Sequence, residues 1–436
     1  LSILLSLLVP AYPTRSPDCG GILSPSGLSY YLTDVWGLPY CGVACRSVLL
    51  PRQLPFCSLR NQITSVTVVE LTLSLIAHSG LQLSINVDLG ITSAPSTTKV
   101  VRLDILADLH VEMNPEGNLE LVTSACKTIV EEAQSTEEAE SKSSSSELSK
   151  KTNIDKICLE VSKLMLSPNE QLISLTTQFP ITPDCQLQYL PLAAPVFSEQ
   201  GITMSLQTTF QVAEMVVPLP VSPVPFSIPE SASSSSSHLT LAFSEHFYTS
   251  LFFAMEMSGA FNMTIVTPQT TATMAQKVTQ MGSLFHDDIP VILQAVFRSS
   301  ARIVLEEGKA ALQLFLTVYV GTGSPAFQSF LTMNVDASAR LLLSISGTKM
   351  KISAAPLEDI EITLVASDVG PVPATLLEEL FLPTIREEVP AQMNEILSEG
   401  VFLPHISGLT FTDVSVVIHK DYVLVPCNLE LQARIG

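Results

Sequence analysis

The sequence predicts an α+β protein with two halves of similar size, each an antiparallel meander of strands accompanied by a long amphipathic helix. Three observations predict it. Five prolines lie within residues 218–229, near the midpoint of the 436 residues. Long runs of alternating apolar and polar residues, typical of strands with one buried face, lie on both sides of that stretch. Each half also contains apolar residues that recur every three or four positions, as along one face of a helix.

The proline-rich stretch is predicted to be an extended linker. Proline lacks a backbone N–H and restricts φ, so closely spaced prolines prevent a helix and most sheet pairing. A run of five serines follows, and we expect a semi-rigid spacer between two domains. The chain then divides into a residual signal peptide (1–11), a Cys/Pro-rich N-terminal extension (12–61), an N-terminal domain (62–217), a Pro/Ser-rich linker (218–237) and a C-terminal domain (238–436). Because the extension is rich in proline, glycine and cysteine, we expect it to be irregular and stapled by disulfides.

The chain is both acidic and apolar. Its net charge is −20, 15% of its residues are charged and its mean hydropathy is +0.37. This charge opposes binding to nucleic acid and disfavours an electrostatic grip on anionic lipid or lipopolysaccharide. After residue 9, no apolar run reaches the roughly 18 residues of a membrane-spanning helix. The apolar residues are therefore expected to be buried, either in an ordinary sheet-rich core or around a cavity for an apolar ligand.

The start of the chain predicts secretion. Residues 1–9 are apolar, and Val9-Pro10-Ala11 fits the small-x-small pattern of a signal-peptidase site. We expect the remnant of a secretory signal, with a buried N-terminal strand as the alternative. Secretion permits disulfides.

Four of the eight cysteines are crowded into residues 19–57. We expect them to pair with one another, in one of three connectivities that the sequence leaves open. A zinc site is the alternative, and only Cys41 and Cys45 have a suitable spacing for it. The four residues are Cys19, Cys41, Cys45 and Cys57.

The N-terminal domain is predicted to be a meander followed by a helix. Apolar residues that alternate with polar ones predict strands over 71–75, 81–89, 100–112 and from Leu119, with a last strand over 202–212. Residues 131–150 hold six glutamates and seven serines and are expected to form a mobile acidic loop. A helix that bends or is interrupted at Pro168 is predicted next. Its apolar residues recur at helical spacing: Ile154, Ile157, Val161, Leu164, Met165, Leu172 and Leu175.

The C-terminal domain repeats this plan. We expect a helix over 243–257, strands over 310–320 and 331–345, a helix over 374–398, and extended segments over 409–418 and 422–431. Pro383 and Pro390 should kink the second helix. Its apolar stripe recurs every four residues: Leu377, Phe381, Ile385, Val389, Met393 and Leu397. An amphipathic helix on a curled sheet leaves an elongated apolar seam, where a long apolar ligand can lodge.

Four features resemble the BPI/LBP/PLUNC superfamily, the secreted relatives of bactericidal/permeability-increasing and lipopolysaccharide-binding proteins. Cys126 and Cys158 flank a loop before a helix, and a proline-rich strap joins the two halves. Residues 238–248, His-Leu-Thr-Leu-Ala-Phe-Ser-Glu-His-Phe-Tyr, are similar to the strand and helix that open the family's second domain. The ending from Thr375, through the kinked helix, to residues 414–425 is the fourth feature.

The resemblance implies an elongated, two-domain boomerang, each half an antiparallel β-barrel with a long helix, joined by a central sheet. It also implies a disulfide between Cys126 and Cys158, and a pocket for phospholipid or another apolar ligand in each half. Helix residues of the two predicted seams are the candidates for lining these pockets: Val161, Leu164, Met165, Phe247, Leu251, Leu377, Phe381, Ile385 and Val389.

Within the superfamily, the chain most resembles BPI fold-containing family B, the long PLUNC group, and its vomeromodulin-like members. This likeness implies a carrier in mucosal or nasal secretions, with a role in innate host defence or in odorant and pheromone transport. The family's defence proteins are cationic near the N-terminal tip, whereas this chain is acidic. Lipopolysaccharide is therefore the less favoured ligand.

The sequence lacks the common motifs of catalysis and cofactor binding: G-x-S-x-G, G-x-G-x-x-G, the P-loop and H-E-x-x-H do not occur. His286-Asp287-Asp288 is explained by a solvated turn before Pro290, since no second histidine lies nearby. We expect no catalytic, cofactor-binding or metal-binding residues. Asn262-Met263-Thr264 is an N-glycosylation sequon.

Two functions are consistent with these features. The first is a secreted, non-enzymatic carrier of lipid or other apolar ligands. The alternative is a secreted interaction or surface-active protein with vestigial pockets, acting through the acidic loop at 131–150. A hydrolase, the third class considered, has no motif to support it.

Overall fold

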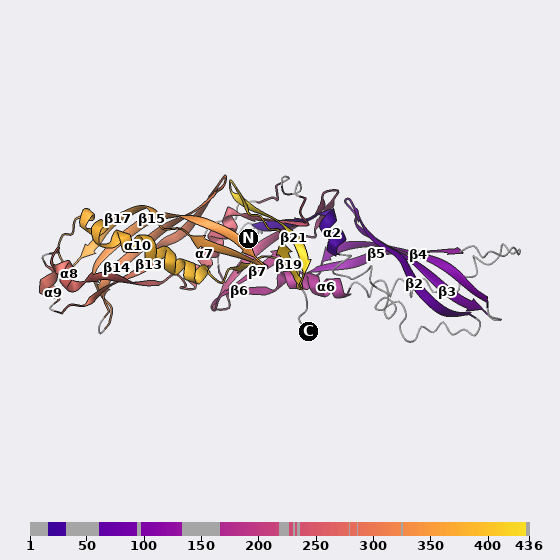
Figure 1. Cartoon of the computed structure of the whole chain (residues 1–436), viewed down its shortest axis with the longest axis horizontal. Helices are drawn as coiled ribbons and strands as arrows, with labels where there is room; N and C mark the ends of the chain where they lie inside the picture. Colours follow the sequence, from indigo (N-terminus) through magenta and orange to yellow (C-terminus); the bar gives the residue numbers. More distant parts are fainter. Residues whose placement is uncertain are drawn as a thin grey trace, which may run out of the picture.

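The molecule is elongated, with three sheets following one another along its length (Figure 1). The structure is a computed structural model that describes residues 16–31, 61–93, 97–132, 166–217, 226–229, 232, 236–278, 280–285, 287–323 and 326–432. A four-stranded sheet lies at one end, a ten-stranded sheet in the middle and a seven-stranded sheet with two longer helices at the other end. The predicted two-domain α+β fold with a central sheet is confirmed.

The four-stranded sheet is the meander that alternation predicts. Its strands pair antiparallel in chain order: β2 (Asn61–Ile76), β3 (Gly80–Ser93), β4 (Thr97–Met113) and β5 (Leu119–Glu132). One face is buried along β3, where Leu81, Leu83, Ile85 and Val87 alternate with partly exposed polar residues. This face packs a core of its own, separate from the larger core of the molecule.

A helix follows this sheet, as expected. The structure describes it from Leu166 as α6 (Leu166–Ile173), continued by a 3₁₀ turn, η4 (Ser174–Thr176). Asn169 anchors it to β5, because its side-chain amide exchanges hydrogen bonds of 2.7 and 3.1 Å with the backbone of Leu121. The expected helical residues 154–165 and most of the acidic loop lie outside the described residues.

The ten-stranded sheet joins the two halves. Its main path runs in the order β19 (Leu409–Thr412), β21 (Tyr422–Leu431), β11 (Leu239–Ser244), β1 (Cys19–Leu23), β9 (Gly201–Val212), β7 (Cys185–Pro191) and β6 (Gln178–Thr182). Three short strands pair beside it: β8 (Val196–Ser198), β10 (Met215–Val216) and β20 (Val417–His419). Strands from the first and second halves thus form one hydrogen-bonded sheet.

The structure corrects the prediction for the N-terminal extension. Residues 19–23 are not irregular but form β1, which pairs antiparallel with β9 on one side and β11 on the other. Cys19 is a free, buried thiol, so its predicted disulfide is wrong. The glycines that suggested a loop instead permit close packing: a Cβ on Gly20 would lie 2.3 Å from the carbonyl oxygen of Met204. The helix α2 (Pro25–Tyr30) follows, capped by Ser24.

The end of the linker packs on the central sheet. Residues 226–229 form neither helix nor strand, whereas residues 218–225 lie outside the described part, so the extended linker stays a prediction. Phe226 and Ile228 contact a small apolar cluster on one face of the sheet, formed by Ile22, Ala232, Ala242 and Leu424. The linker therefore covers this face of the sheet. The opposite face of β1 points into the interior of the molecule.

The seven-stranded sheet carries the larger core. Its main path is β12 (Met263–Thr270), β13 (Pro290–Glu306), β14 (Lys309–Thr322), β15 (Gln328–Ser346), β16 (Lys349–Ala354) and β18 (Val401–Phe402), with β17 (Glu358–Ser367) paired to β15. The helices are α7 (Glu245–Met257), α8 (Thr271–Ala275), α9 (Met281–Leu284) and α10 (Ala374–Leu397). Helix α10 contains both Pro383 and Pro390 and buries the predicted apolar stripe.

A buried carboxylate lies where the two halves meet. The Asp18 side chain is 2% exposed. One carboxylate oxygen accepts a 2.9 Å hydrogen bond from the Thr208 backbone N–H on β9, and the other accepts from the Thr208 hydroxyl. The Asp18 carbonyl accepts a 2.9 Å bond from the backbone N–H of Ser244, which caps α7. Asp18 therefore links β1 to β9 and to the first helix of the second half.

Removing the Asp18 carboxylate should destabilise this junction. In Asp18→Ala, the buried N–H and hydroxyl of Thr208 lose their acceptors, at about 1–3 kcal/mol for each unsatisfied group. Asp18→Asn retains an acceptor and should lose less. Urea unfolding of both variants measures the difference; equal stability of Asp18→Ala and wild type would contradict this role.

The stability of the junction should also depend on pH. Burial raises the pKa of the Asp18 carboxyl above its ordinary 3.8, although the hydrogen bonds from Thr208 and the nearby His246 oppose this shift. The folded protein thus binds the proton more tightly than the unfolded chain, so the stability contributed by Asp18 falls as pH rises above about 3.8. The wild-type free energy of unfolding, minus that of Asp18→Asn, should decrease over this range in urea titrations. A difference that rises with pH would refute the assignment.

Candidate functional site

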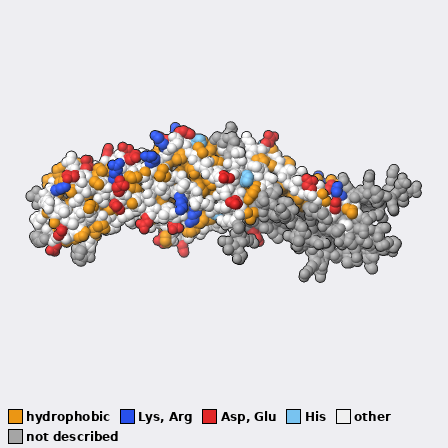
Figure 2. Space-filling model, viewed as in Figure 1, with side chains coloured by type: hydrophobic (Ala, Val, Ile, Leu, Met, Phe, Trp, Pro, Cys, Tyr) orange, Lys and Arg blue, Asp and Glu red, His pale blue; other side chains and the backbone are white. Residues whose placement is uncertain are grey.

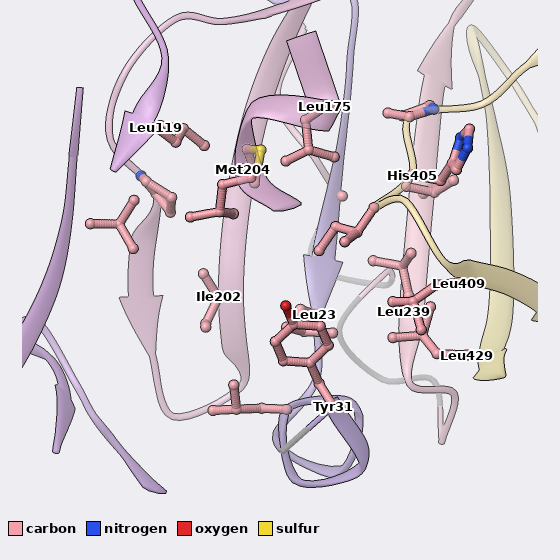
Figure 3. Close-up of a pocket in the computed structure, with 18 of the residues that line it drawn as sticks. Leu23, Tyr31, Leu119, Leu175, Ile202, Met204, Leu239, His405, Leu409 and Leu429 are labelled. Carbon is pink, nitrogen blue, oxygen red and sulfur yellow. The ribbon is translucent and has the colours of Figure 1, made fainter. Parts of the chain in front are cut away.

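An apolar cavity of about 190 Å³ lies where the N-terminal meander meets the central sheet (Figure 3). One wall is the face of the central sheet that the linker does not cover. Within this wall, Gly21 is opposite Met204 and Leu241, and Leu23 is opposite Ile202 and Leu239. Because side chains two residues apart point to the same face of a strand, these residues line the cavity together.

The other walls come from segments far apart in the sequence. The meander and the helices of the first half contribute Leu28, Tyr31, Leu73, Leu81, Val111, Leu119, Leu121, Leu172 and Leu175. The last part of the chain contributes Pro404, His405, Ile406, Leu409, Phe411 and Leu429. Residues from both halves thus line the space.

The cavity separates the two hydrophobic cores. Leu81 and Leu121 belong to the core of the four-stranded sheet, whereas Leu206 and Leu241 belong to the large core. An apolar molecule in this position would contact both cores at once. The space is therefore a natural site for an apolar ligand.

Only two described residues of the lining, Tyr31 and His405, carry polar side chains. The hydroxyl of Tyr31 points toward the middle of the lining residues, while His405 lies at their edge (Figure 3). The Nδ1 atom of His405 is 2.8 Å from the Leu403 carbonyl oxygen, and its ring lies 5.4 Å from that of Phe179 and 6.0 Å from that of Phe402. None of the described lining residues is Lys, Arg, Asp or Glu.

The described helix residues that were predicted to line pockets are not part of this cavity. Val161, Leu164 and Met165 lie outside the described residues. The six from the second half are each 0% exposed and belong to the large core: Phe247, Leu251, Leu377, Phe381, Ile385 and Val389. A small hollow beside α7 and α10, lined in part by Met255 and Leu397, has no room for even a water molecule. Their role as pocket residues stays a prediction.

Sequence reasoning placed several lining residues on buried strand faces but did not assign them to a pocket. The alternation of Ile202, Met204 and Leu206 marked them as one face of a strand. The partner strand, β1, was hidden in a segment interpreted as irregular. A short apolar segment with two glycines, Cys19 to Leu23, was the available signal for it.

The remaining predicted sites are only partly described. Cys126 is disulfide-bonded, and its partner lies outside the described residues, so the pairing with Cys158 stays a prediction. Cys185 and Cys427 are free and buried. Asn262 is exposed at the turn between α7 and β12, and its glycosylation stays a prediction.

Several residue types used in catalysis meet near the junction. The hydroxyl of Ser250 lies 3.4 Å from Nε2 of His246 on α7, and the charge of Asp18 acts on that histidine. Burial lowers the pKa of His246, although Asp18 opposes this effect. Ser250, however, is 0% exposed, and the carboxylate of Asp18 accepts hydrogen bonds from Thr208. This cluster is suited to joining secondary-structure elements, since a substrate could not reach the serine.

The described part of the chain holds neither a membrane-spanning helix nor a metal-binding cluster. In that part, no helix combines the length and apolar character needed to cross a membrane. Nor do three or more His, Cys, Asp or Glu side chains gather there in a group that could hold a metal ion. At the predicted turn, Asp287 and Asp288 accept hydrogen bonds from Thr271 and Ala272 at the start of α8, while His286 lies outside the described residues.

Comparisons with known proteins define the class. A family model described as the C-terminal domain of the LBP/BPI/CETP family matches residues 182–431. The chain is 59% identical to Protein TENP of Gallus gallus over 443 residues, covering 100% of each. It is 23% identical to BPI fold-containing family B member 2 of Homo sapiens, covering 99% of each. The chain therefore belongs to the LBP/BPI/CETP family, and the predicted superfamily is confirmed.

A solved structure agrees with this assignment. The crystal structure of lipopolysaccharide binding protein superposes with a TM-score of 0.54, covering 96% of this chain and 100% of that chain, at 17% sequence identity. At this identity the likeness concerns the fold alone. The specific resemblance to vomeromodulin-like members stays a prediction.

The packing of the second half can be tested at Phe381. Because its ring is fully buried against the large core, Phe381→Ala should lower the free energy of unfolding by about 3–5 kcal/mol, measured by urea denaturation. Phe381→Leu, the conservative control, should cost less. Little loss of stability in Phe381→Ala would instead indicate a residue that lines open space.

Proposed function

We propose that this protein is a secreted, non-enzymatic carrier that holds a lipid or another apolar ligand in the cavity between its two cores. The observation that carries the proposal is the composition of the lining, whose described residues are apolar except for Tyr31 and His405. Family membership supports it, because lipopolysaccharide binding protein, which shares the fold, is named for an amphipathic ligand.

The driving force would be removal of the ligand's apolar surface from water. Each buried methylene contributes about 0.8 kcal/mol. Apolar side chains from distant segments already form the walls, so the protein pays little additional ordering cost when a ligand enters. Phospholipid tails and other apolar molecules are both candidate ligands.

The charge distribution disfavours lipopolysaccharide as the ligand. The chain carries a net charge of −20, and the described lining contains no basic side chain to neutralise a phosphate. On the face shown in Figure 2, Lys and Arg side chains are scattered among Asp and Glu side chains rather than gathered in one patch. Ligand capture should therefore depend on apolar contacts more than on ionic ones.

The resemblance and the disulfide at Cys126 support secretion as the place of action. The long PLUNC likeness supports a carrier in mucosal or nasal fluid, acting in host defence or in odorant transport. The predicted helix seam of the first half, including Val161, is proposed as an additional ligand contact.

Binding at the cavity can be tested by filling it. Met204 lines the cavity, whereas Met215 on the neighbouring strand β10 is 71% exposed. Met204→Trp should weaken binding of a fluorescent apolar probe at least tenfold, because the larger ring occupies the ligand's space. Met215→Trp, the matched control, should bind as wild type.

Native mass spectrometry of the secreted wild type, followed by organic extraction, should find bound apolar material. Circular dichroism and the urea midpoint should establish that Met204→Trp is folded. Undiminished binding in that variant would exclude this cavity as the site. A delipidated wild-type protein that takes up no apolar compound would refute the carrier function.

A further inference from the structure

We propose that His238 is an acid-sensitive latch, whose neutral imidazole holds the end of β21 beside α2 and whose protonation releases it. His238 directly precedes β11, at the start of the second half of the chain. The latch goes beyond the proposed function, because it concerns how two distant segments are held together; only its effect on ligand binding rests on the carrier function. Two observations carry it: the course of β21 past β11, and the contacts of the His238 ring.

The last residues of β21 extend beyond β11. The pairing of these two strands ends where Leu239 lies opposite Cys427, and residues 428–431 pair with β19 on their other edge. Alternate N–H groups of a strand point to the same edge. The N–H groups of Leu429 and Leu431 are therefore directed toward the edge along which β11 has ended, and they need acceptors there.

Side chains provide these acceptors. Nδ1 of His238 accepts a 3.2 Å hydrogen bond from the Leu429 N–H, and the Tyr30 hydroxyl of α2 accepts a 3.3 Å bond from the Leu431 N–H. The two rings are stacked, with their centroids 4.9 Å apart. The backbone N–H of His238 also donates a 3.2 Å bond to the side-chain oxygen of Asn428. The imidazole and the phenol thus connect the end of β21 to α2.

The backbone of His238 is itself attached to α2. Its carbonyl oxygen accepts hydrogen bonds of 2.9 Å from the Ser24 N–H and 3.1 Å from the Ser24 hydroxyl, at the N-cap of the helix. Gly27 lies against the same carbonyl, since a Cβ there would be 2.2 Å from its oxygen. His238 and α2 are therefore held together, and the bonds to Leu429 and Leu431 join them to β21.

Only the neutral imidazole can make the bond to Leu429. A ring nitrogen that accepts a hydrogen bond carries no proton, so the proton of the neutral ring is on Nε2. In the protonated ring both nitrogens are donors, and Nδ1 would then face the Leu429 N–H, which is also a donor. The contribution of this bond is therefore lost as the pH falls through about 8 to 5, the range in which histidine changes its charge.

The described titratable groups around His238 come from α2, β21 and the residue after β19: Tyr30, Cys427, Glu430 and Asp413. Burial raises the pKa of the Cys427 thiol to about 12, so it stays neutral. Glu430 is exposed, and the carboxylate of Asp413 accepts a 3.0 Å hydrogen bond from the amide of Asn428. A charge on the imidazole would therefore gain no direct ion pair from either carboxylate.

Release of the latch would loosen one border of the cavity. Leu28 of α2 and Leu429 of β21 both line the cavity, and Leu239 and Tyr31 border it next to them (Figure 3). When the end of β21 separates from α2, an apolar ligand loses contacts on this side. We therefore expect the affinity for apolar ligands to fall at acidic pH.

Hydrogen–deuterium exchange of residues 428–432 in the full chain measures the latch. In His238→Asn the side-chain oxygen takes the place of Nδ1 and remains an acceptor at every pH. Wild type and His238→Asn should protect this segment alike near pH 7.5. Near pH 5.5 the wild type should exchange about tenfold faster than His238→Asn, as expected for one lost hydrogen bond and its unsatisfied donor. Comparing variants at one pH cancels the pH dependence of the intrinsic exchange rate.

Three further variants separate the latch from other effects of acid. His238→Ala, which has no acceptor, should exchange rapidly at both pH values. His78→Asn, at an exposed histidine in the turn after β2, and Asp413→Asn should both keep the wild-type response. Circular dichroism, and unchanged protection of β14, should establish that every variant is folded. Equal protection of wild type and His238→Asn near pH 5.5 would overturn the latch, as would loss of the acid response in Asp413→Asn.

The effect on the cavity is measured with diphenylhexatriene, an uncharged apolar probe. Its affinity for the wild type should fall about tenfold between pH 7.5 and 5.5, in proportion to the loss of protection. Its affinity for His238→Asn should stay constant. An equal fall in both proteins would overturn the coupling of the latch to the cavity. A wild type that binds neither this probe nor lipid at either pH would refute the carrier function, whereas the exchange experiment would still decide the latch.

Discussion

The architecture depends on the insertion of one short strand between the two halves of the chain. β1, residues 19–23, pairs with β9 of the first half and with β11 of the second. Without it, these strands would lose their hydrogen-bonded neighbour in the centre of the sheet. The close approach requires a residue without a side chain at Gly20, where a Cβ would meet the Met204 carbonyl at 2.3 Å. Asp18 then extends the junction to β9 and α7 through buried hydrogen bonds.

The cavity is a consequence of this junction. Alternate residues of β1 point to opposite faces, so Ile22 packs beneath the linker while Gly21 and Leu23 face the cavity. The four-stranded sheet has a core of its own, and Leu23 of β1 packs against both that core and the large core.

Sequence patterns correctly predicted helices and strands whose buried face is marked by a regular spacing of apolar residues. The stripe at Leu377, Phe381 and Ile385 predicted α10, and alternation from Ala310 to Val320 predicted β14. The same patterns did not identify the cavity, because periodicity shows that a face is buried and not whether it meets side chains or empty space. The side chain of Phe381, on helix α10, is packed in the large core. The side chain of Met204, on the regularly alternating strand β9, faces the cavity.

The sequence by itself determined the α+β class, the long strands and helices, and the acidic, apolar character of the molecule, since each is encoded in local composition or spacing. Only the tertiary structure decided the place of β1 and the position of the cavity. The pairing of Cys19–Leu23 with strands about 180 to 220 residues away depends on contacts that no local pattern records. The lining, likewise, is assembled from both ends of the chain, from Gly21 to Leu429.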